Sequence, residues 1–371
     1  MRVLVTGGAG FIGSHLVDGL LAAGCEVRAF DALASQVHGS DRKRPAYLAA
    51  AAELVVGDVR DRAALARALD GVEAVVHQAA AVGVGQSMYE IERYVSANSV
   101  GTAVLLEELA ARRQQIRRLV VASSMSLYGE GAYRDAAGRL AFPPPRSAEA
   151  LAAGRYELRD EAGGPLTPVP TPETKPLQPT SVYAVTKRDH EELCLTIGGA
   201  YGIPTVALRY FNVYGPRQAL SNPYTGVMAI FSARLLNGRP PLVYEDGLQT
   251  RDFVHVSDVV RANLLALERP EAAGRVYNVG TGVATSVLDV GGRLARELAF
   301  EGPPDVPGRF RAGDIRHCVA DVSRIRGELG YEPRVALDDG LREFLDWLRT
   351  ETPEDRLEQA TRELAERGLA R

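Results

Sequence analysis

The stretch RVLVTGGAGFIG, residues 2–13, decides the fold of this chain. Its first five residues are an apolar, β-branched run typical of a buried strand, and a helical pattern begins after Gly10. Gly7 permits a tight turn, Gly10 lets the backbone approach a pyrophosphate, and Gly13 lets the helix pack close to the strand. The helix N-terminus would present free N–H groups to an anion. An ordinary glycine turn is the alternative, but the strand before and the helix after favour a dinucleotide-binding turn.

Outward from this turn, short apolar runs alternate with helical stretches. We expect strands over residues 2–6, 26–30, 53–56, 73–77, 117–122 and 205–210. We expect helices over residues 11–23, 61–69, 90–113 and 181–200. Apolar strands that alternate with helices indicate a parallel sheet covered on both faces. The predicted fold is therefore α/β, a doubly wound parallel (Rossmann) sheet with a smaller, mixed C-terminal domain.

The domain boundaries follow from changes in this rhythm. Residues 1–211 are predicted to form the dinucleotide-binding domain, and 251–268 return to it. Residues 212–250 and 269–350 form the second domain, and 351–371 form a helical tail that starts near residues 352–355. A Pro/Gly-rich insert, 131–179, interrupts the first domain. It is either a surface loop or a substrate lid.

Composition excludes several classes of protein. The 371 residues are 24% charged and 46% hydrophobic, and 43 basic against 47 acidic residues give a net charge of −4. This balance offers no basic face for nucleic acid. No apolar run reaches about 18 residues, so we expect no membrane span and a cytoplasmic location. Cys25, Cys194 and Cys318 lie far apart, and we expect no metal site.

Two carboxylates follow predicted strands. Asp31 ends the second strand, where it would accept hydrogen bonds from the adenosine ribose hydroxyls and repel a 2′-phosphate. This favours NAD over NADP, and the alternative is an Asp that caps a turn. Asp58 follows the third strand and would either meet the adenine amino group or cap the next helix.

A second pattern suggests acid–base chemistry. Tyr183 and Lys187 lie four apart in a helical stretch, so their side chains share one face. A nearby ammonium and a cationic nicotinamide would both lower the phenol pKa from about 10, which would make Tyr183 a base toward a sugar hydroxyl. Ser124 follows a strand at the carboxyl edge of the sheet and can bridge the substrate oxygen and the tyrosine. Separately these could be a surface pair and a turn cap, but together with the glycine turn they indicate a catalytic triad.

These residues together resemble the extended short-chain dehydrogenase/reductase family, over roughly residues 2–349. The matching segments are 6–13, 77–80, 98–102, 209–216, 251–259 and 277–280. The resemblance implies an NAD cofactor held by Gly7, Gly10, Phe11, Ile12, Gly13, Asp31, Asp58, Val59, Gln78, Ala79, Ala80, Asn98, Tyr183, Lys187 and Tyr210. It also implies a nucleotide-sugar substrate held by Val82, Gly83, Ser87, Ser124, Ser126, Asn212, Arg251 and Arg311. By the same resemblance, Asn212, Arg251 and Arg311 hold the pyrophosphate, which suits the planar fork of arginine.

The segment after Ser124 bears on the reaction. Nucleotide-sugar 4,6-dehydratases resemble it but carry an Asp-Glu pair at Met125 and Ser126, and nucleotide-glucuronate decarboxylases carry a Glu at Ser126. Residues 81–88 and 165–170 are similar to bacterial dTDP-L-rhamnose 4-epimerases. Many such relatives carry cysteine pairs in the insert, which this chain lacks over 158–164.

The resemblance therefore implies an NAD-dependent nucleotide-sugar 4-epimerase that acts through a transient 4-keto sugar. The substrate would be a dTDP-6-deoxyhexose such as dTDP-L-rhamnose, or a UDP-hexose. The main alternative is a 4-ketoreductase or dehydrogenase whose cofactor exchanges at each turnover. Less favoured are a 4,6-dehydratase, a decarboxylase and a non-catalytic NAD-binding protein.

The helices over 98–113 and 181–200 carry more apolar residues than one sheet needs. The residues concerned are Val104, Leu105, Leu109, Leu193 and Leu195. We expect a homodimer through these helices, with burial in the protomer's own core as the alternative.

Overall fold

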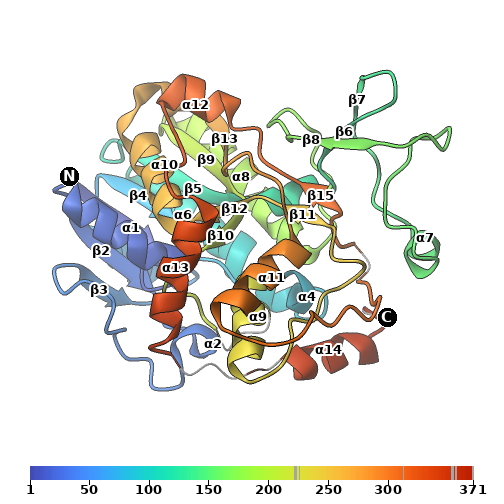
Figure 1. The fold of residues 1–371 in the computed structure, drawn as a ribbon. Coiled ribbons are helices and arrows are strands. Elements are labelled where there is room, and N and C mark those ends of the chain that lie inside the picture. Colours follow the sequence, from blue (N-terminus) through green and yellow to red (C-terminus); the bar gives the residue numbers. More distant parts are fainter. Residues whose placement is uncertain (221–223, 225, 312, 352–354, 356, 370–371) are drawn as a thin grey trace.

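A seven-stranded parallel sheet forms the centre of the computed structural model, which describes residues 1–371 except 221–223, 225, 312, 352–354, 356, 370 and 371 (Figure 1). The strands are β1 (Arg2–Thr6), β2 (Glu26–Asp31), β3 (Glu53–Val56), β4 (Ala74–His77), β5 (Arg118–Ser124), β9 (Thr205–Tyr210) and β13 (Arg275–Val279). Their order is β13-β9-β5-β4-β1-β2-β3. The chain runs outward from β1 to β3 and then crosses back to β4, so the strand order reverses between β1 and β4. Ligands of doubly wound folds bind at such a switch point.

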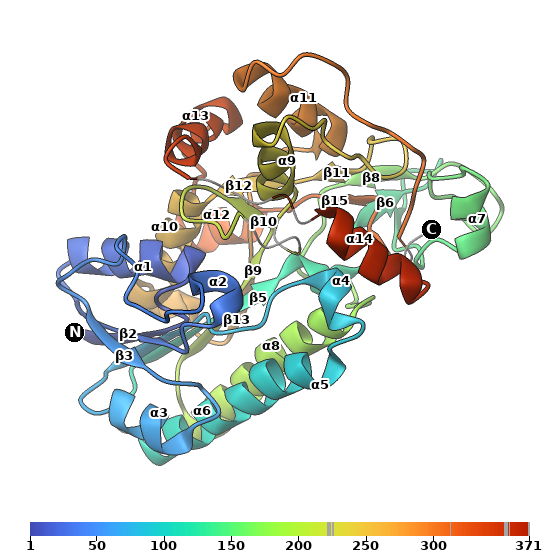
Figure 2. The ribbon, with the colours of Figure 1, turned by 90° about the horizontal axis from the view of Figure 1, so that it is seen from below.

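Helices cover both faces of the sheet (Figure 2). On one face, α1 (Phe11–Ala22) packs against α10 (Val256–Glu268). On the other, α6 (Gly101–Ala111) lies between α3 (Arg62–Ala68) and α8 (Val182–Tyr201). Each layer encloses its own apolar core, one around Val5 and Leu16 and the other around Leu4 and Leu105. The structure confirms the predicted doubly wound fold.

A third, smaller core lies beyond the carboxyl ends of the strands. It is built on α9 (Val227–Leu236), α11 (Val287–Glu297) and α13 (Leu337–Leu348). Beside it, β10 (Asn212–Tyr214) pairs with β12 (Phe253–His255), and a short sheet has the order β14-β11-β15. The strands of that sheet are β11 (Thr250–Arg251), β14 (Thr285–Ser286) and β15 (His317–Cys318).

One predicted boundary is wrong. The prediction places the range 269–350 entirely in the second domain, yet β13 is hydrogen-bonded to β9 as the edge strand of the main sheet. The physical reason is that the β13 side chains complete the main core, in which Tyr277 and Val279 are fully buried. Helix α12 (Ser323–Leu329) also packs against β13. The other boundaries stay predictions.

The insert folds into a compact unit at one side of the main body (Figure 1). Strands β6 (Ala132–Arg134), β7 (Leu140–Ala141) and β8 (Thr167–Val169) form an antiparallel sheet, accompanied by α7 (Ala148–Ala152). Its small core consists of Tyr133, Leu158 and Leu166.

The predicted helix over 90–113 is helical over most of its length but not uniform. It consists of α5 (Ile91–Tyr94), a π-helical segment η1 (Val95–Val100) and α6. Such π segments are frequent at functional sites, and this one carries the buried Asn98.

Short helices and the tail complete the fold. The short helices are α2 (Ser35–His38), α4 (Val84–Ser87), η2 (Met125–Tyr128) and η3 (Pro270–Ala272). In the tail, α14 (Leu357–Glu366) packs Leu357 against Leu242 and Tyr244. The predicted start of the tail helix, 352–355, falls largely outside the described residues. Among the residues that are described, no helix is both long and apolar enough to cross a membrane.

Candidate active site

A cavity of about 540 Å³ opens at the carboxyl ends of the strands, at the switch point. It brings together most of the residues that the sequence singled out. The predicted residues that line it are Gly7, Gly10, Phe11, Ile12, Gly13, Asp31, Asp58, Val59, Gln78, Ala79, Ala80, Val82, Ser124, Tyr183, Lys187, Tyr210 and Asn212.

The glycine turn has the geometry that an anion site requires. Gly7 adopts φ +68°, and a Cβ on Gly13 would lie 2.0 Å from the Gly7 carbonyl oxygen. Helix α1 begins after Gly10 with no side-chain cap and no acidic residue in its first turn. Its first N–H groups and its dipole therefore favour a phosphate at this end of the cavity.

Asp31 links the turn to the second strand. Its Oδ2 accepts a hydrogen bond from the Ala9 N–H at 3.0 Å, and its Oδ1 accepts one from Leu33 N–H at 2.8 Å. Asp58 pairs with Arg60, whose hydrogen bond lowers the pKa of the Asp58 carboxyl. Asp61, rather than Asp58, caps α3, so the capping alternative for Asp58 is wrong.

Helix α8 positions the proposed base. Ser181 caps it by accepting the Ala184 N–H, and the Tyr183 N–H donates to Ser87 Oγ at 3.0 Å. Lys187 lies one turn further along, 3% exposed, on the same face. Ser124 ends β5 opposite Tyr210 of β9, and its Oγ accepts from the backbone N–H and the hydroxyl of Ser126.

The electrostatics of the triad differ from the sequence expectation. Burial raises the pKa of Tyr183 to about 12, and only the Ser124 hydroxyl acts against it. Burial also lowers the pKa of Lys187 to about 8, so a smaller fraction of its amino group is protonated near that pH. In the protein alone the phenol is therefore held neutral, because desolvation penalises the phenolate more than the neighbouring groups stabilise it.

Sequence reasoning missed two buried polar groups behind the triad. His190 lies 3.4 Å from Lys187, measured from Nδ1 to Nζ, and its ring stacks on His77. Its position three residues after Lys187 was the available signal.

The second group is the buried ion pair of Glu191 and Arg209. Glu191 also accepts a hydrogen bond from the Ser123 hydroxyl at 2.7 Å. These contacts tie α8 to β5 and β9, which fixes Tyr183 relative to Ser124.

The cavity lining does not include every predicted residue. Those outside it are Asn98, Gly83, Ser87, Ser126, Arg251 and Arg311. The buried Asn98 amide accepts a hydrogen bond from the Ala81 N–H, donates one to the Ala81 carbonyl and donates another to Thr186 Oγ1, and its predicted role in cofactor binding stays a prediction. Gly83 is buried behind the cavity wall, where an added Cβ would meet the Tyr94 hydroxyl.

The two predicted pyrophosphate arginines lie in the second unit, which consists of the small core of α9, α11 and α13, the adjoining β14-β11-β15 sheet and the loops between these elements. The Arg251 guanidinium donates to the backbone carbonyls of Thr250, Ile315 and Arg316. Arg311 is partly exposed, with its guanidinium over the Tyr244 ring. Their role with a substrate stays a prediction.

Known proteins are similar to this chain in sequence and in fold. The sequence pattern described as the NAD dependent epimerase/dehydratase family matches residues 3–150 and 160–280. A dTDP-L-rhamnose 4-epimerase from Burkholderia thailandensis is 37% identical over 94% of this chain and 95% of its own length. A UDP-glucose 4-epimerase from Thermotoga maritima, solved with UDP-glucose, is 32% identical with a TM-score of 0.77, over 94% of this chain and 99% of its own. The UDP-glucose 4-epimerase of Thermus thermophilus, solved with NAD, is also 32% identical, with a TM-score of 0.72 and the same coverage.

The chain therefore belongs to the NAD dependent epimerase/dehydratase family, within the extended short-chain dehydrogenase/reductases. It is an NAD-dependent epimerase, and its site fits that cofactor. The uncapped start of α1 suits the pyrophosphate, and the Asp31 carboxylate suits ribose hydroxyls.

Proposed function

We propose that this protein is a nucleotide-sugar 4-epimerase, with Ser124, Tyr183 and Lys187 as its catalytic residues. The observation that carries the proposal is that, among the described residues, no acid lines the cavity beside the triad. Of the described residues that line the cavity, only Asp31 and Asp58 are acidic; Asp31 ends β2 and Asp58 follows β3, both on the glycine-turn side of the sheet.

The two positions after Ser124 explain why a dehydratase or a decarboxylase is disfavoured. Met125 is 7% exposed and packs into the main core. Ser126 is 8% exposed and donates its hydroxyl hydrogen to Ser124. Neither side chain can exchange a proton with a sugar as a carboxyl group does, whereas epimerisation at C4 needs only a base at O4.

In the proposed reaction, Tyr183 removes the proton from the sugar O4, and Ser124 orients that hydroxyl. Bound NAD supplies a hydride acceptor that takes the C4 hydride and later returns it. Lys187 holds the cofactor ribose and stabilises the phenolate. The 4-keto sugar turns in the pocket, so that the hydride returns to its other face, and Tyr183 returns the proton to O4. Asn212, Arg251 and Arg311 retain the pyrophosphate meanwhile, which uses remote binding energy to keep a reactive intermediate.

We infer a dTDP-6-deoxyhexose such as dTDP-L-rhamnose as the substrate, with a UDP-hexose as the second candidate. The 37% identity with the Burkholderia thailandensis dTDP-L-rhamnose 4-epimerase supports the first. The 32% identity with UDP-glucose 4-epimerases supports the second.

The test is to incubate the purified protein and NAD with a panel of dTDP- and UDP-sugars. Proton NMR would follow the C4 configuration, and mass spectrometry would follow the product mass. We expect one sugar to give a C4 epimer of unchanged mass, with NAD retained through purification. Loss of water or carbon dioxide would overturn the proposal. Net oxidation or reduction of the sugar with exchange of the cofactor would indicate the ketoreductase alternative.

We also propose a homodimer through α8 and the neighbouring helices α5, η1 and α6, which lie side by side (Figure 2). This face exposes Ile91 by 53%, Val100 by 48% and Val185 by 45%. Of the five apolar residues that the sequence analysis named for the dimer, only Leu193 belongs to this exposed face. The other four are buried or partly buried in the protomer's own core, which is the alternative reading for them. Sedimentation of the wild type and of Val100→Glu tests the dimer, and a monomeric wild type would overturn it.

A cytoplasmic location stays a prediction.

A further inference from the structure

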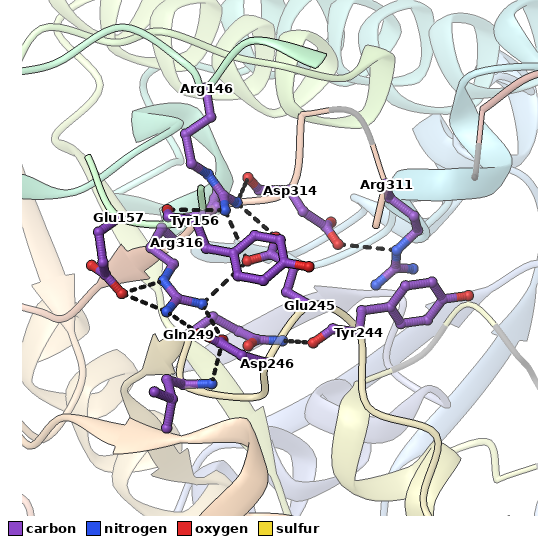
Figure 3. A network of polar contacts seen from close by, with 12 residues as sticks. Arg146, Tyr156, Glu157, Tyr244, Glu245, Asp246, Gln249, Arg311, Asp314 and Arg316 are labelled. Atoms are coloured by element: carbon purple, nitrogen blue, oxygen red, sulfur yellow. Dashed lines mark hydrogen bonds and ion pairs between the residues drawn. The ribbon is translucent and has the colours of Figure 1, made fainter. Parts of the chain in front are cut away.

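The insert reaches the second unit through two charged side chains. Its ends are tied to β15 and the residue after it, because Gly131 N–H donates to the His317 carbonyl and Thr171 N–H donates to the Val319 carbonyl, each at 2.8 Å. Arg146 and Glu157 point from the insert toward residues of the second unit (Figure 3). They lie outside the insert's own apolar core.

Arg146 makes a two-pronged ion pair with Glu245. Its Nη1 lies 2.8 Å from Glu245 Oε2, and its Nη2 lies 2.9 Å from Oε1. The same Nη2 donates to the backbone carbonyl of Asp314 at 2.8 Å. The Arg146 side chain is only 4% exposed. A paired arginine–carboxylate contact of this kind fixes relative geometry as well as contributing energy.

Arg146 contacts two chain segments, one at Glu245 and one at Asp314, and both segments also contact Arg311. The Asp314 carboxylate lies 3.1 Å from Arg311 Nε. Tyr244, the residue before Glu245, places its ring 4.6 Å beneath the Arg311 guanidinium (Figure 3). Arg146 therefore joins the two chain segments that carry these side chains, through the Glu245 carboxylate, 99 positions along the sequence, and through the Asp314 backbone carbonyl.

A second link lies beside the first. The fully buried Arg316 forms ion pairs with Glu157 of the insert and with Glu245 and Asp246 of the second unit. The Arg316 backbone carbonyl in turn accepts a hydrogen bond from Arg251 at 3.2 Å. The insert thus contacts the surroundings of both arginines predicted to bind the pyrophosphate.

We propose that Arg146 is a positioning residue for nucleoside diphosphate binding, through which the insert holds Arg311 in its binding orientation. This rests on the proposed function, because it takes Arg311 to bind the pyrophosphate. Arg146 cannot touch the substrate itself, since its guanidinium is buried against Glu245 and Asp314. Its loss should therefore weaken diphosphate binding and leave NAD binding and the triad intact.

The test is calorimetric binding of UDP and dTDP to the full-length protein and to Arg146→Gln. The expected result is an affinity about tenfold to hundredfold weaker, the range for losing one or two charge-assisted hydrogen bonds. The KM for the nucleotide sugar should rise with little change in kcat, and the NAD content should match the wild type. Arg139→Gln is the matched control, because Arg139 lies in the insert, is 81% exposed and pairs only with Asp135 among the described residues.

Arg146→Lys keeps the charge and serves if the glutamine variant does not fold. It should lose part of the affinity, because an ammonium cannot reproduce the two-pronged contact. Wild-type affinity for UDP and dTDP in a folded Arg146 variant would overturn the proposal, as would failure of the wild type to bind either nucleotide. Nucleotide binding that responds to Arg146 in a protein without epimerase activity would leave this inference standing and overturn the proposed function alone.

Discussion

The ionisation of Tyr183 provides a direct test of the proposed chemistry. Burial raises its pKa to about 12 in the protein alone. At a working pH near 8, forming the phenolate would then cost about 5 kcal/mol, from 1.36 kcal/mol for each pKa unit. One unit charge in close contact with the phenolate contributes about 4 kcal/mol at an effective dielectric constant near 20. Oxidised NAD should therefore raise the phenolate fraction of Tyr183 about a thousandfold at a given pH.

Difference absorbance of the phenolate, wild type minus Tyr183→Phe, isolates this tyrosine from the other thirteen. Titrations without nucleotide, with oxidised NAD and with NADH would be compared. We expect the Tyr183 signal to appear at a distinctly lower pH with oxidised NAD only, because NADH carries no nicotinamide charge. Turnover should rise with pH through the same transition, since the deprotonated phenol is the base.

The variant Lys187→Met measures how much the second cation in the site, the Lys187 ammonium, stabilises the Tyr183 phenolate. Its removal should shift the Tyr183 transition to higher pH even with oxidised NAD bound. Identical titrations with and without oxidised NAD would refute the electrostatic reasoning. Full turnover by Tyr183→Phe would refute the assignment of the base.

Three further predictions follow from contacts around the site. Asp31→Asn should weaken NAD binding about tenfold or more and reduce the preference for NAD over NADP, because the Asp31 carboxylate would accept hydrogen bonds from the ribose hydroxyls. Titration of both proteins with each cofactor measures the two affinities. An unchanged ratio of the affinities for NAD and NADP would contradict the prediction. Arg209→Met should lower the free energy of unfolding by about 3–5 kcal/mol, because it leaves the Glu191 carboxylate buried and unpaired. Urea denaturation checks this, and the double variant with Glu191→Gln should recover part of the loss. The pKa of His77 is lowered to about 3 by burial, with the Lys187 charge acting in the same direction. The folded state then binds fewer protons than the unfolded state, so His77 contributes to the free energy of unfolding above about pH 6.5, and this contribution is lost as the pH falls toward 3. His77→Asn should therefore make the urea midpoint depend less on pH over this range.

The sequence was enough to predict six of the seven strands of the main sheet, the glycine turn, and the helix that carries Tyr183 and Lys187 on one face. The reason is that these depend on local patterns: an apolar run makes a strand, and spacing by four places Tyr183 and Lys187 on one helix face. Because parallel strands end at one edge of the sheet, the strand pattern alone places Asp31, Ser124 and Tyr210 around one cavity, as the structure confirms.

The tertiary structure alone decided the features that depend on burial or on distant partners. The pKa of Tyr183 is raised rather than lowered, because desolvation depends on everything packed around the phenol. The β13 strand joins the main sheet because Tyr277 and Val279 complete a core that local pattern does not describe. The contact of Arg146 with Glu245 likewise requires the path of the whole chain, since no periodicity in sequence links residues 99 positions apart.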